Sequence, residues 1–182
     1  MDSLGAGLAI GLASLGGAIG IGIMMGYAYT SIARNPKEMG KIRPLIFIGI
    51  AFAEATVLYA LVISLILLGN AGDEVKEAAG PENVKGLAAG LSIGFAALGG
   101  AIGIGVMMGK AFASVAEQPA AMSKIRPLIF VGIAFREAMV LYALIISLIL
   151  LSGSGTGGGE AKDSSLDNVP PPPVVIDITD TV

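Results

Sequence analysis

Two acidic residues stand nearly alone in long uncharged stretches and could carry protons. Glu54 is the one charged residue between positions 44 and 69, and Glu137 lies between 127 and 151, where Arg136 is the only other charge. An ionised carboxylate inside a membrane costs at least about 2.5 kcal/mol on insertion scales. Each acid is therefore expected to be neutral where it faces lipid and to ionise only where water or a cation is offered, which is the chemistry of a proton carrier.

The depth of both acids favours this interpretation. Glu54 follows Pro44 by ten residues, and Glu137 follows Pro127 by ten. At a rise of ~1.5 Å per helical residue, each acid would lie ~15 Å deep, near the midplane of a bilayer. The structural alternative is a hydrogen bond that holds two helices together. Duplication of the acid in two nearly uncharged stretches favours the carrier.

Arg136 makes the second acid ambiguous, because a nearby cation favours an ionised carboxylate. In one interpretation the two residues pair, the second acid stays ionised and Glu54 alone carries protons. In the other, Arg136 points into a helix interface or toward lipid headgroups and leaves Glu137 active. The sequence leaves both interpretations open.

The residues around each acid predict the ion. Phe52 and small apolar residues surround Glu54, and few oxygen atoms are offered to a cation that needs several. Tyr59 and Tyr142, five positions after each acid, could bring a hydroxyl near it, whereas Thr56 in the first stretch is replaced by Met139 in the second. The sequence therefore predicts H⁺, with Na⁺ disfavoured, and no cofactor or metal. With neither Cys nor His in the chain, thiolate and imidazole ligands are excluded.

The elements that hold these residues are membrane helices. Only 14% of the 182 residues are charged and 54% are hydrophobic, against about 25% charged in soluble domains. Charges are absent from 3–33 and 86–109 and almost absent from 44–69 and 127–151. Each stretch can span a hydrocarbon core, where the backbone must satisfy its own hydrogen bonds. The fold class is an all-α membrane protein with four transmembrane helices.

An internal repeat groups the helices into two antiparallel hairpins. Residues 41–68 align with 124–151 at an offset of 83, and only four of these 28 positions differ. This duplication predicts four parts. They are a first transmembrane hairpin at 1–70, an acidic external link at 71–85, a second hairpin at 86–152 and a disordered Gly/Pro-rich tail at 153–182.

Loop charges predict the orientation. The first loop inside a hairpin is basic, and the second carries Lys124 and Arg126 with Lys110 just before it, whereas the link between hairpins is acidic. By the positive-inside rule, the loops inside the hairpins face the cytoplasm and both termini lie outside.

Small residues form two stripes on opposite faces of the first and third helices. One stripe holds Gly16 and Gly20, with Gly99 and Gly103 as repeat equivalents; the other holds Gly22 and Gly26, with Gly105 and Gly109. Small residues four apart let helix backbones approach closely. Opposed stripes permit a neighbour on each side and so a closed ring of hairpins. The alternative is packing within a single four-helix bundle.

Together, the glycine ladder, the loop Ala33-Arg34-Asn35-Pro36 and the Phe-x-Glu-Ala motif with a following Tyr resemble the c subunit, or rotor proteolipid, of F-type ATP synthases. The resemblance covers residues 5–69 and 88–151. Duplication itself is typical of V-type and some archaeal rotor proteolipids. The second hairpin departs from the pattern, because Glu117 replaces the arginine of its loop.

The resemblance implies a homo-oligomeric ring in membrane lipid that couples ion flow to rotation and to ATP synthesis or ATP-driven pumping. Glu54 and Glu137 match the ion-carrying acid that exchanges protons with the a subunit of the membrane sector, while Arg34, Asn35 and Pro36 match the loop that contacts the central stalk. Sodium-binding relatives carry Gln and Ser where this chain has apolar residues. A plasma membrane location follows if the source is a prokaryote. One working acid per four helices would mean fewer protons per turn.

Other function classes fit less well. A small four-helix cation/proton antiporter would need aromatic or polar residues around a cavity, and only 5% of residues are aromatic. A structural scaffold would use the acids only for packing. The net charge of −3 without a basic stripe argues against nucleic acid. No nucleophile–base set or phosphate loop is present, so no catalytic site is expected on this chain.

Overall fold

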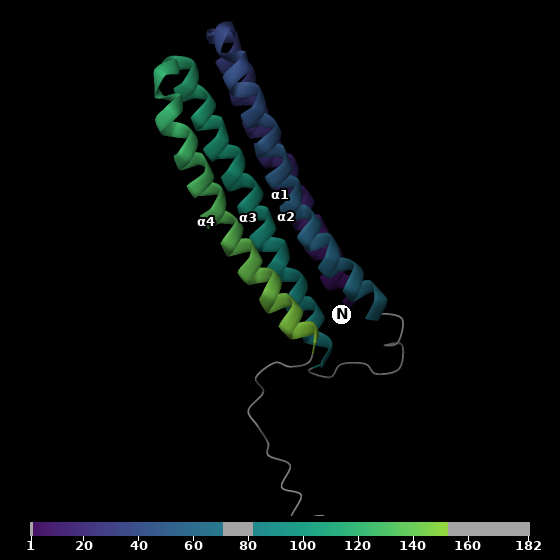
Figure 1. The fold of residues 1–182 in the computed structure, drawn as a ribbon. Coiled ribbons are helices and arrows are strands. Elements are labelled where there is room, and N and C mark those ends of the chain that lie inside the picture. Colours follow the sequence, from purple (N-terminus) through teal and green to yellow (C-terminus); the bar gives the residue numbers. More distant parts are fainter. Residues whose placement is uncertain (1, 71–81, 153–182) are drawn as a thin grey trace, which may run out of the picture.

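The computed structural model describes residues 2–70 and 82–152, and this part of the chain forms long helices (Figure 1). They are α1 (Asp2–Arg34), α2 (Met39–Asn70), α3 (Glu82–Glu117) and α4 (Met122–Leu151), with the short 3₁₀ helices η1 (Pro36–Glu38) and η2 (Pro119–Ala121). All four long helices have the length and hydropathy to cross a membrane. The predicted all-α class and the two hairpins are confirmed.

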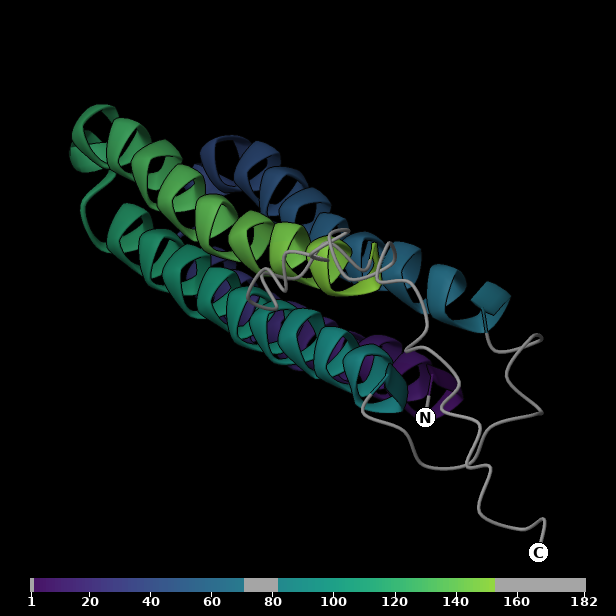
Figure 2. The same ribbon diagram turned by 90° about the horizontal axis from the view of Figure 1, so that it is seen from below.

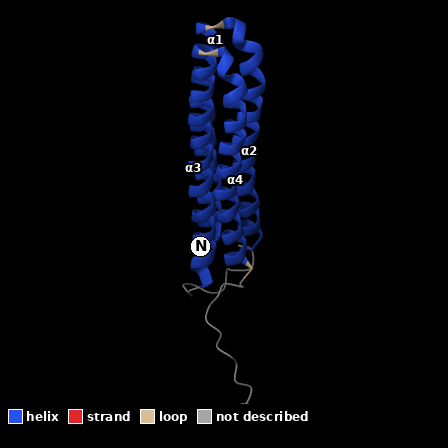
Figure 3. Ribbon diagram, turned by 60° about the vertical axis from the view of Figure 1, so that its left-hand side comes forward, coloured by secondary structure: helices blue, strands red, loops and turns tan. Residues whose placement is uncertain are grey.

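Each hairpin consists of two antiparallel helices that run side by side. The turns at η1 and η2 lie at one end of the bundle, and the start of α1 lies at the other end (Figures 1 and 3). Helix α3 begins at Glu82, inside the predicted link 71–85, of which 71–81 lies outside the described residues. The predicted tail 153–182 lies outside them as well.

The second helix of each hairpin begins before the proline where its apolar stretch was expected to start. Pro44 lies inside α2, and Pro127 lies inside α4. A helical proline leaves the carbonyl four residues earlier without its usual partner. In α2 that residue is Gly40, which is exposed at the start of the helix, so water can satisfy its carbonyl.

Helices α1 and α3 form the centre of the bundle. Helix α2 packs against both α1 and α3, whereas α4 packs mainly against α3. Viewed from below, α1 and α3 lie together beneath α2 and α4 (Figure 2). The two pairs therefore stack side by side, each with one inner and one outer helix.

Small residues allow the inner helices to approach until their backbones touch. A side-chain carbon at Gly16 or Gly20 would overlap the α3 backbone at Leu98 or Ala101, and one at Gly105 would overlap the Gly20 carbonyl. Real side-chain carbons do not lie this close to backbone atoms. Glycine at these points is thus required by the helix spacing.

One serine hydrogen bond repeats in both hairpins. The Ser64 hydroxyl donates to the Ala6 carbonyl at 3.0 Å, and the Ser147 hydroxyl donates to the Ala89 carbonyl at 2.9 Å. Both serines are buried. A buried hydroxyl needs such a partner, so this bond fixes the same register between outer and inner helix in each hairpin.

Candidate functional site

The first acid, Glu54, is exposed on α2 at the free edge of hairpin 1. It lines a groove of about 350 Å³ between α1 and α2. The other lining residues are Ser14, Gly17, Ala18, Ile21, Val57 and Leu58. Among the described residues, the Glu54 carboxylate has no cationic partner. The groove walls are apolar apart from Ser14, and the acid is open to a partner from outside the chain.

The second acid, Glu137, lies between the hairpins and is already engaged. Nη2 of Arg136 lies 2.6 Å from its Oε2, and the Tyr59 hydroxyl of α2 donates to its Oε1 at 2.7 Å. The side chains of Arg136 and Glu137 are only 11% and 16% exposed. Both carboxylate oxygens therefore accept a hydrogen bond inside the chain.

Arg136 also ties α4 to α2. Its Nη2 donates to the Phe52 carbonyl at 3.0 Å, while its Nε and Nη1 are buried without a hydrogen-bond partner in the described part of the chain. A side-chain carbon at Gly100 would lie 3.5 Å from Nη1, so the guanidinium lies against α3 at a point where that helix carries no side chain. Arg136 thus points into the interface between the hairpins and pairs there with Glu137.

The hydroxyls near the acids follow a pattern that the sequence did not specify. Tyr59 bonds to the acid of the other hairpin, and its repeat equivalent Tyr142 is 64% exposed on α4. Thr56 is fully buried and donates to the Ala53 carbonyl at 2.6 Å within its own helix. Phe52 is half-buried and contributes its carbonyl to Arg136.

The predicted glycine stripes are both present, but the chain uses different ones on its two inner helices. Gly16 and Gly20 of α1 are buried, whereas their equivalents Gly99 and Gly103 of α3 meet open space. On the opposite stripe the order reverses. Gly22 and Gly26 of α1 meet open space, while Gly105 and Gly109 of α3 face α1. The hairpins thus stack head to tail. The face of α1 with Gly22 and Gly26 and the face of α3 with Gly99 and Gly103 stay uncovered.

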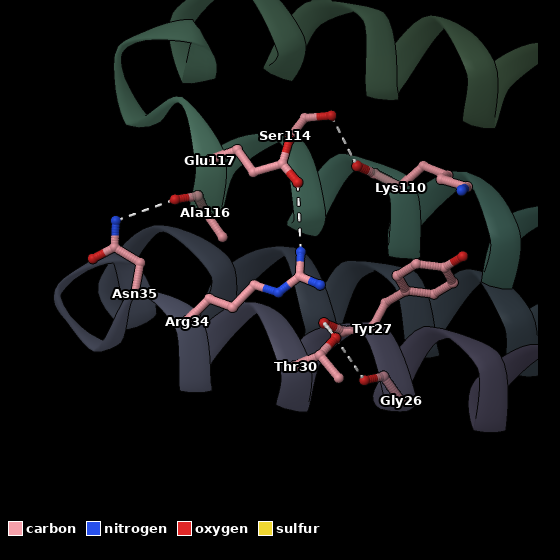
Figure 4. Close-up of polar contacts among 9 residues, drawn as sticks. All are labelled: Gly26, Tyr27, Thr30, Arg34, Asn35, Lys110, Ser114, Ala116 and Glu117. Atoms are coloured by element: carbon pink, nitrogen blue, oxygen red, sulfur yellow. Dashed lines mark hydrogen bonds and ion pairs between the residues drawn. The ribbon is translucent and has the colours of Figure 1, made fainter.

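The loop residues predicted to bind a stalk contact the second loop (Figure 4). The Arg34 guanidinium lies 3.5 Å from the Glu117 carboxylate, and the Asn35 amide donates to the Ala116 carbonyl at 3.2 Å. Pro36 begins η1. The pairing of Arg34 with Glu117 was not predicted. Its signal was available, because opposite charges occupy equivalent positions in two repeats that stack head to tail.

A second polar contact lies close to this loop pair. The Lys110 ammonium lies 5.3 Å from the centroid of the Tyr27 ring, a cation–π distance. Figure 4 shows both residues beside the loops, on facing helices. Neither residue was singled out from the sequence as a site.

Comparison with known proteins identifies the hairpin unit. The family of the ATP synthase C subunit matches residues 4–67 and again residues 87–150, which is more than half of the chain. The ATP synthase c subunit of Syntrophomonas wolfei is 48% identical over 69 residues, covering 38% of this chain and 96% of that protein. The ATP synthase c subunit of Clostridium acetobutylicum is 46% identical over 68 residues, covering 37% of this chain and 83% of that protein.

Proposed function

We propose that this chain, which belongs to the ATP synthase C-subunit family as a tandem duplicate of its hairpin, carries protons on Glu54 and couples their flow to rotation. Family membership makes it a membrane subunit of an ATP synthase complex, the rotor proteolipid, and not a catalytic one. The observation that carries the proposal is the position of Glu54, exposed in an apolar groove at the free edge of hairpin 1.

The groove suits an acid that is loaded, carried and unloaded. Its carboxylate is open to exchange with a proton path on another subunit, and no cation within the described residues holds it ionised. Surrounded by apolar walls, the acid is favoured in its neutral form, because an unpaired charge at this depth is costly. A charged partner or water at one point of the rotation would release the proton.

The uncovered faces support a ring of such chains. The stripe of α1 with Gly22 and Gly26 is open in hairpin 1, and the stripe of α3 with Gly99 and Gly103 is open in hairpin 2. Inside the chain, equivalent stripes already pack together. A second copy can therefore repeat the same contact, and a head-to-tail contact of this kind closes into a ring when its rotation closes.

The Glu54 groove would then lie at the junction between copies. In-chain packing places Tyr59 of α2 on Glu137. Repeating that packing in a ring would bring Tyr142 of one copy beside Glu54 of the next. Its exposure of 64% leaves the side chain available for that contact.

Proton transport is favoured over sodium transport by the scarcity of oxygen ligands. Ser14 is the one hydroxyl that lines the groove with Glu54, and Thr56 is turned into its own helix. A dehydrated hard cation needs several oxygen ligands. No cluster of acidic residues that could hold a metal ion occurs in the described ranges.

The remaining partners follow from the family and the loop chemistry. The loop with Arg34, Asn35 and Pro36 would contact the central stalk, and Glu54 would exchange protons with the a subunit of the membrane sector. The basic loops would face the cytoplasm and the termini the outside of a prokaryotic plasma membrane. The bacterial relatives support that location.

ATP-driven proton pumping by membrane vesicles that contain the whole complex tests the carrier. The substitution Glu54→Gln should abolish pumping, because an amide cannot release a proton, whereas Ser14→Ala in the same groove should leave it within about twofold. Labelling by a hydrophobic carbodiimide, which attacks protonated carboxyls, should modify Glu54, decline as pH rises and be unaffected by Na⁺. Pumping that survives in E54Q would contradict the carrier, and protection of Glu54 by Na⁺ would contradict the ion.

A further inference from the structure

We infer that Arg136 holds Glu137 permanently ionised, so that hairpin 2 carries no proton and each chain supplies one working site. This inference rests on the proposed function, since it concerns which of the two acids does the carrying. It decides between the two interpretations that the sequence left open, and it assigns Arg136 the role of a positioning residue that switches off its neighbour.

The first argument is the hydrogen bonding of Glu137. Its Oε2 accepts from the Arg136 guanidinium at 2.6 Å, and its Oε1 accepts from the Tyr59 hydroxyl at 2.7 Å. Both contacts favour the ionised carboxylate. Arginine keeps its charge well above neutral pH, so its effect persists across the pH range in which the acids would be tested.

The second argument is the cost of protonating Glu137. Protonation would leave the Arg136 charge buried without its counter-ion, and removal of one partner from a buried pair is strongly unfavourable. Nε and Nη1 of Arg136 already lack partners in the described residues. The guanidinium therefore depends on the carboxylate for most of its compensation.

The third argument is the absence of any competing charge. Tyr59 faces the pair from α2, and Gly100 faces it from α3. Helix α3 has no charged residue between 86 and 109, and the pair itself holds the only charges of α4 between 127 and 151. The one charge of α2 between 44 and 69 is Glu54, which is exposed in the groove of hairpin 1 and forms no ion pair with Arg136. With no other group to receive the proton or to attract Arg136, the ion pair is the stable state.

The consequence concerns the coupling of the rotor. The pair is neutral as a whole and nearly enclosed, so hairpin 2 can pass lipid without loading an ion. A ring of these chains would hold one proton site for every two hairpins. Fewer protons would cross per turn, and each would have to supply more of the energy of ATP synthesis, which suits ATP-driven pumping.

Site-resolved carbodiimide labelling of the full chain in its native membrane tests the inference. In the unaltered protein Glu54 should label and decline as pH rises, while labelling of Glu137 should be lower by about tenfold or more at every pH. The substitution Arg136→Ala restores the residue type found at the equivalent position 53, and it should raise Glu137 labelling by about tenfold. Equal labelling of both acids in the unaltered protein, or no rise in R136A, would overturn the inference.

Proton pumping by the double variant R136A/E137A gives an independent readout, because it leaves no unpaired charge and tests Glu137 directly. Pumping should persist within about twofold of the unaltered complex; its loss would show that Glu137 carries protons. Failure of the proposed function has a different signature, an unlabelled Glu54 and active E54Q. Even then, the double variant decides whether Glu137 takes part.

Discussion

The two hairpins of this chain have almost the same sequence and the same internal contacts, yet their acids lie in opposite environments. Both hairpins keep the buried serine bond between outer and inner helix. Glu54 is exposed in a groove, whereas Glu137 is 16% exposed and paired. Two causes separate them: hairpin 1 covers the acid of hairpin 2, and Arg136 stands where hairpin 1 has Ala53.

This comparison shows how a duplicated chain can give equivalent residues different surroundings. The Glu137 site is completed inside the chain, so it is present in every copy before assembly. The Glu54 site would be completed only by another copy. A change that inactivates the in-chain site therefore leaves the assembly-dependent site intact.

The largest expected effect comes from transferring Arg136 to the first hairpin. Ala53→Arg should abolish ATP-driven proton pumping, because the new guanidinium would pair with Glu54. Gly17 is the repeat equivalent of Gly100, and a side-chain carbon at either glycine would approach a valine of the outer helix. Ala53 is buried, so the folded state of the variant is checked by its assembly into the complex. Pumping in vesicles containing the whole complex is the measurement, with ATP hydrolysis recorded alongside.

Its matched control is the same substitution with the acid of hairpin 2 released, A53R/R136A. If pairing alone decides which acid works, this variant should regain part of its pumping through Glu137. Unimpaired pumping in A53R would show that an adjacent arginine does not silence an acid in this fold.

The next effect compares the covered and the open glycine stripes. Gly20→Val should lower the free energy of unfolding by about 1–3 kcal/mol or more, because overpacking forces the inner helices apart. A side-chain carbon at Gly20 would overlap the Ala101 carbonyl, whereas one at Gly103 meets no atom of the chain. Gly103→Val should therefore change stability by no more than about 0.5 kcal/mol. Denaturation of the single chain by SDS in mild detergent measures both.

Ring formation should respond to the two glycines differently from stability. G103V should leave the chain folded but prevent large detergent-resistant assemblies, because it obstructs the face expected to meet another copy. Native electrophoresis separates the two states. A normal assembly in G103V would mean that copies do not meet through this stripe.

Much of the fold could be predicted from the sequence because helix length, hydropathy and repetition are local signals. Both glycine stripes were predicted, but not which one each inner helix uses, since equivalent positions carry the same residues. That choice depends on where the neighbouring hairpin lies. The structure was needed to show that Gly20 faces α3 whereas Gly103 faces no other part of the chain.

The site was less predictable because long side chains reach beyond their own turn. Adjacent positions on a helix point about 100° apart, so spacing alone left the pairing of Arg136 and Glu137 open. Tyr59 bonds to Glu137 in the other hairpin, a contact that no local pattern encodes. Two helices also begin earlier than their apolar stretches predicted. Helix α2 begins at Met39 rather than at 44, and α3 begins at Glu82 rather than at 86.

The smallest expected effect concerns the loops, where hairpin 1 is basic and hairpin 2 carries an acid. Arg34 and Glu117 lie 3.5 Å apart with side chains 67% and 65% exposed, so their coupling energy should be about 0.2–1 kcal/mol. A double-mutant cycle of Arg34→Ala and Glu117→Ala measures it. In about 1 M salt the Debye length falls to about 3 Å, and the coupling should disappear. The hydrogen bond from Asn35 to the Ala116 carbonyl is uncharged and should persist at high salt. A coupling between Arg34 and Glu117 that survives high salt would contradict the assignment of this pair as a screened surface ion pair.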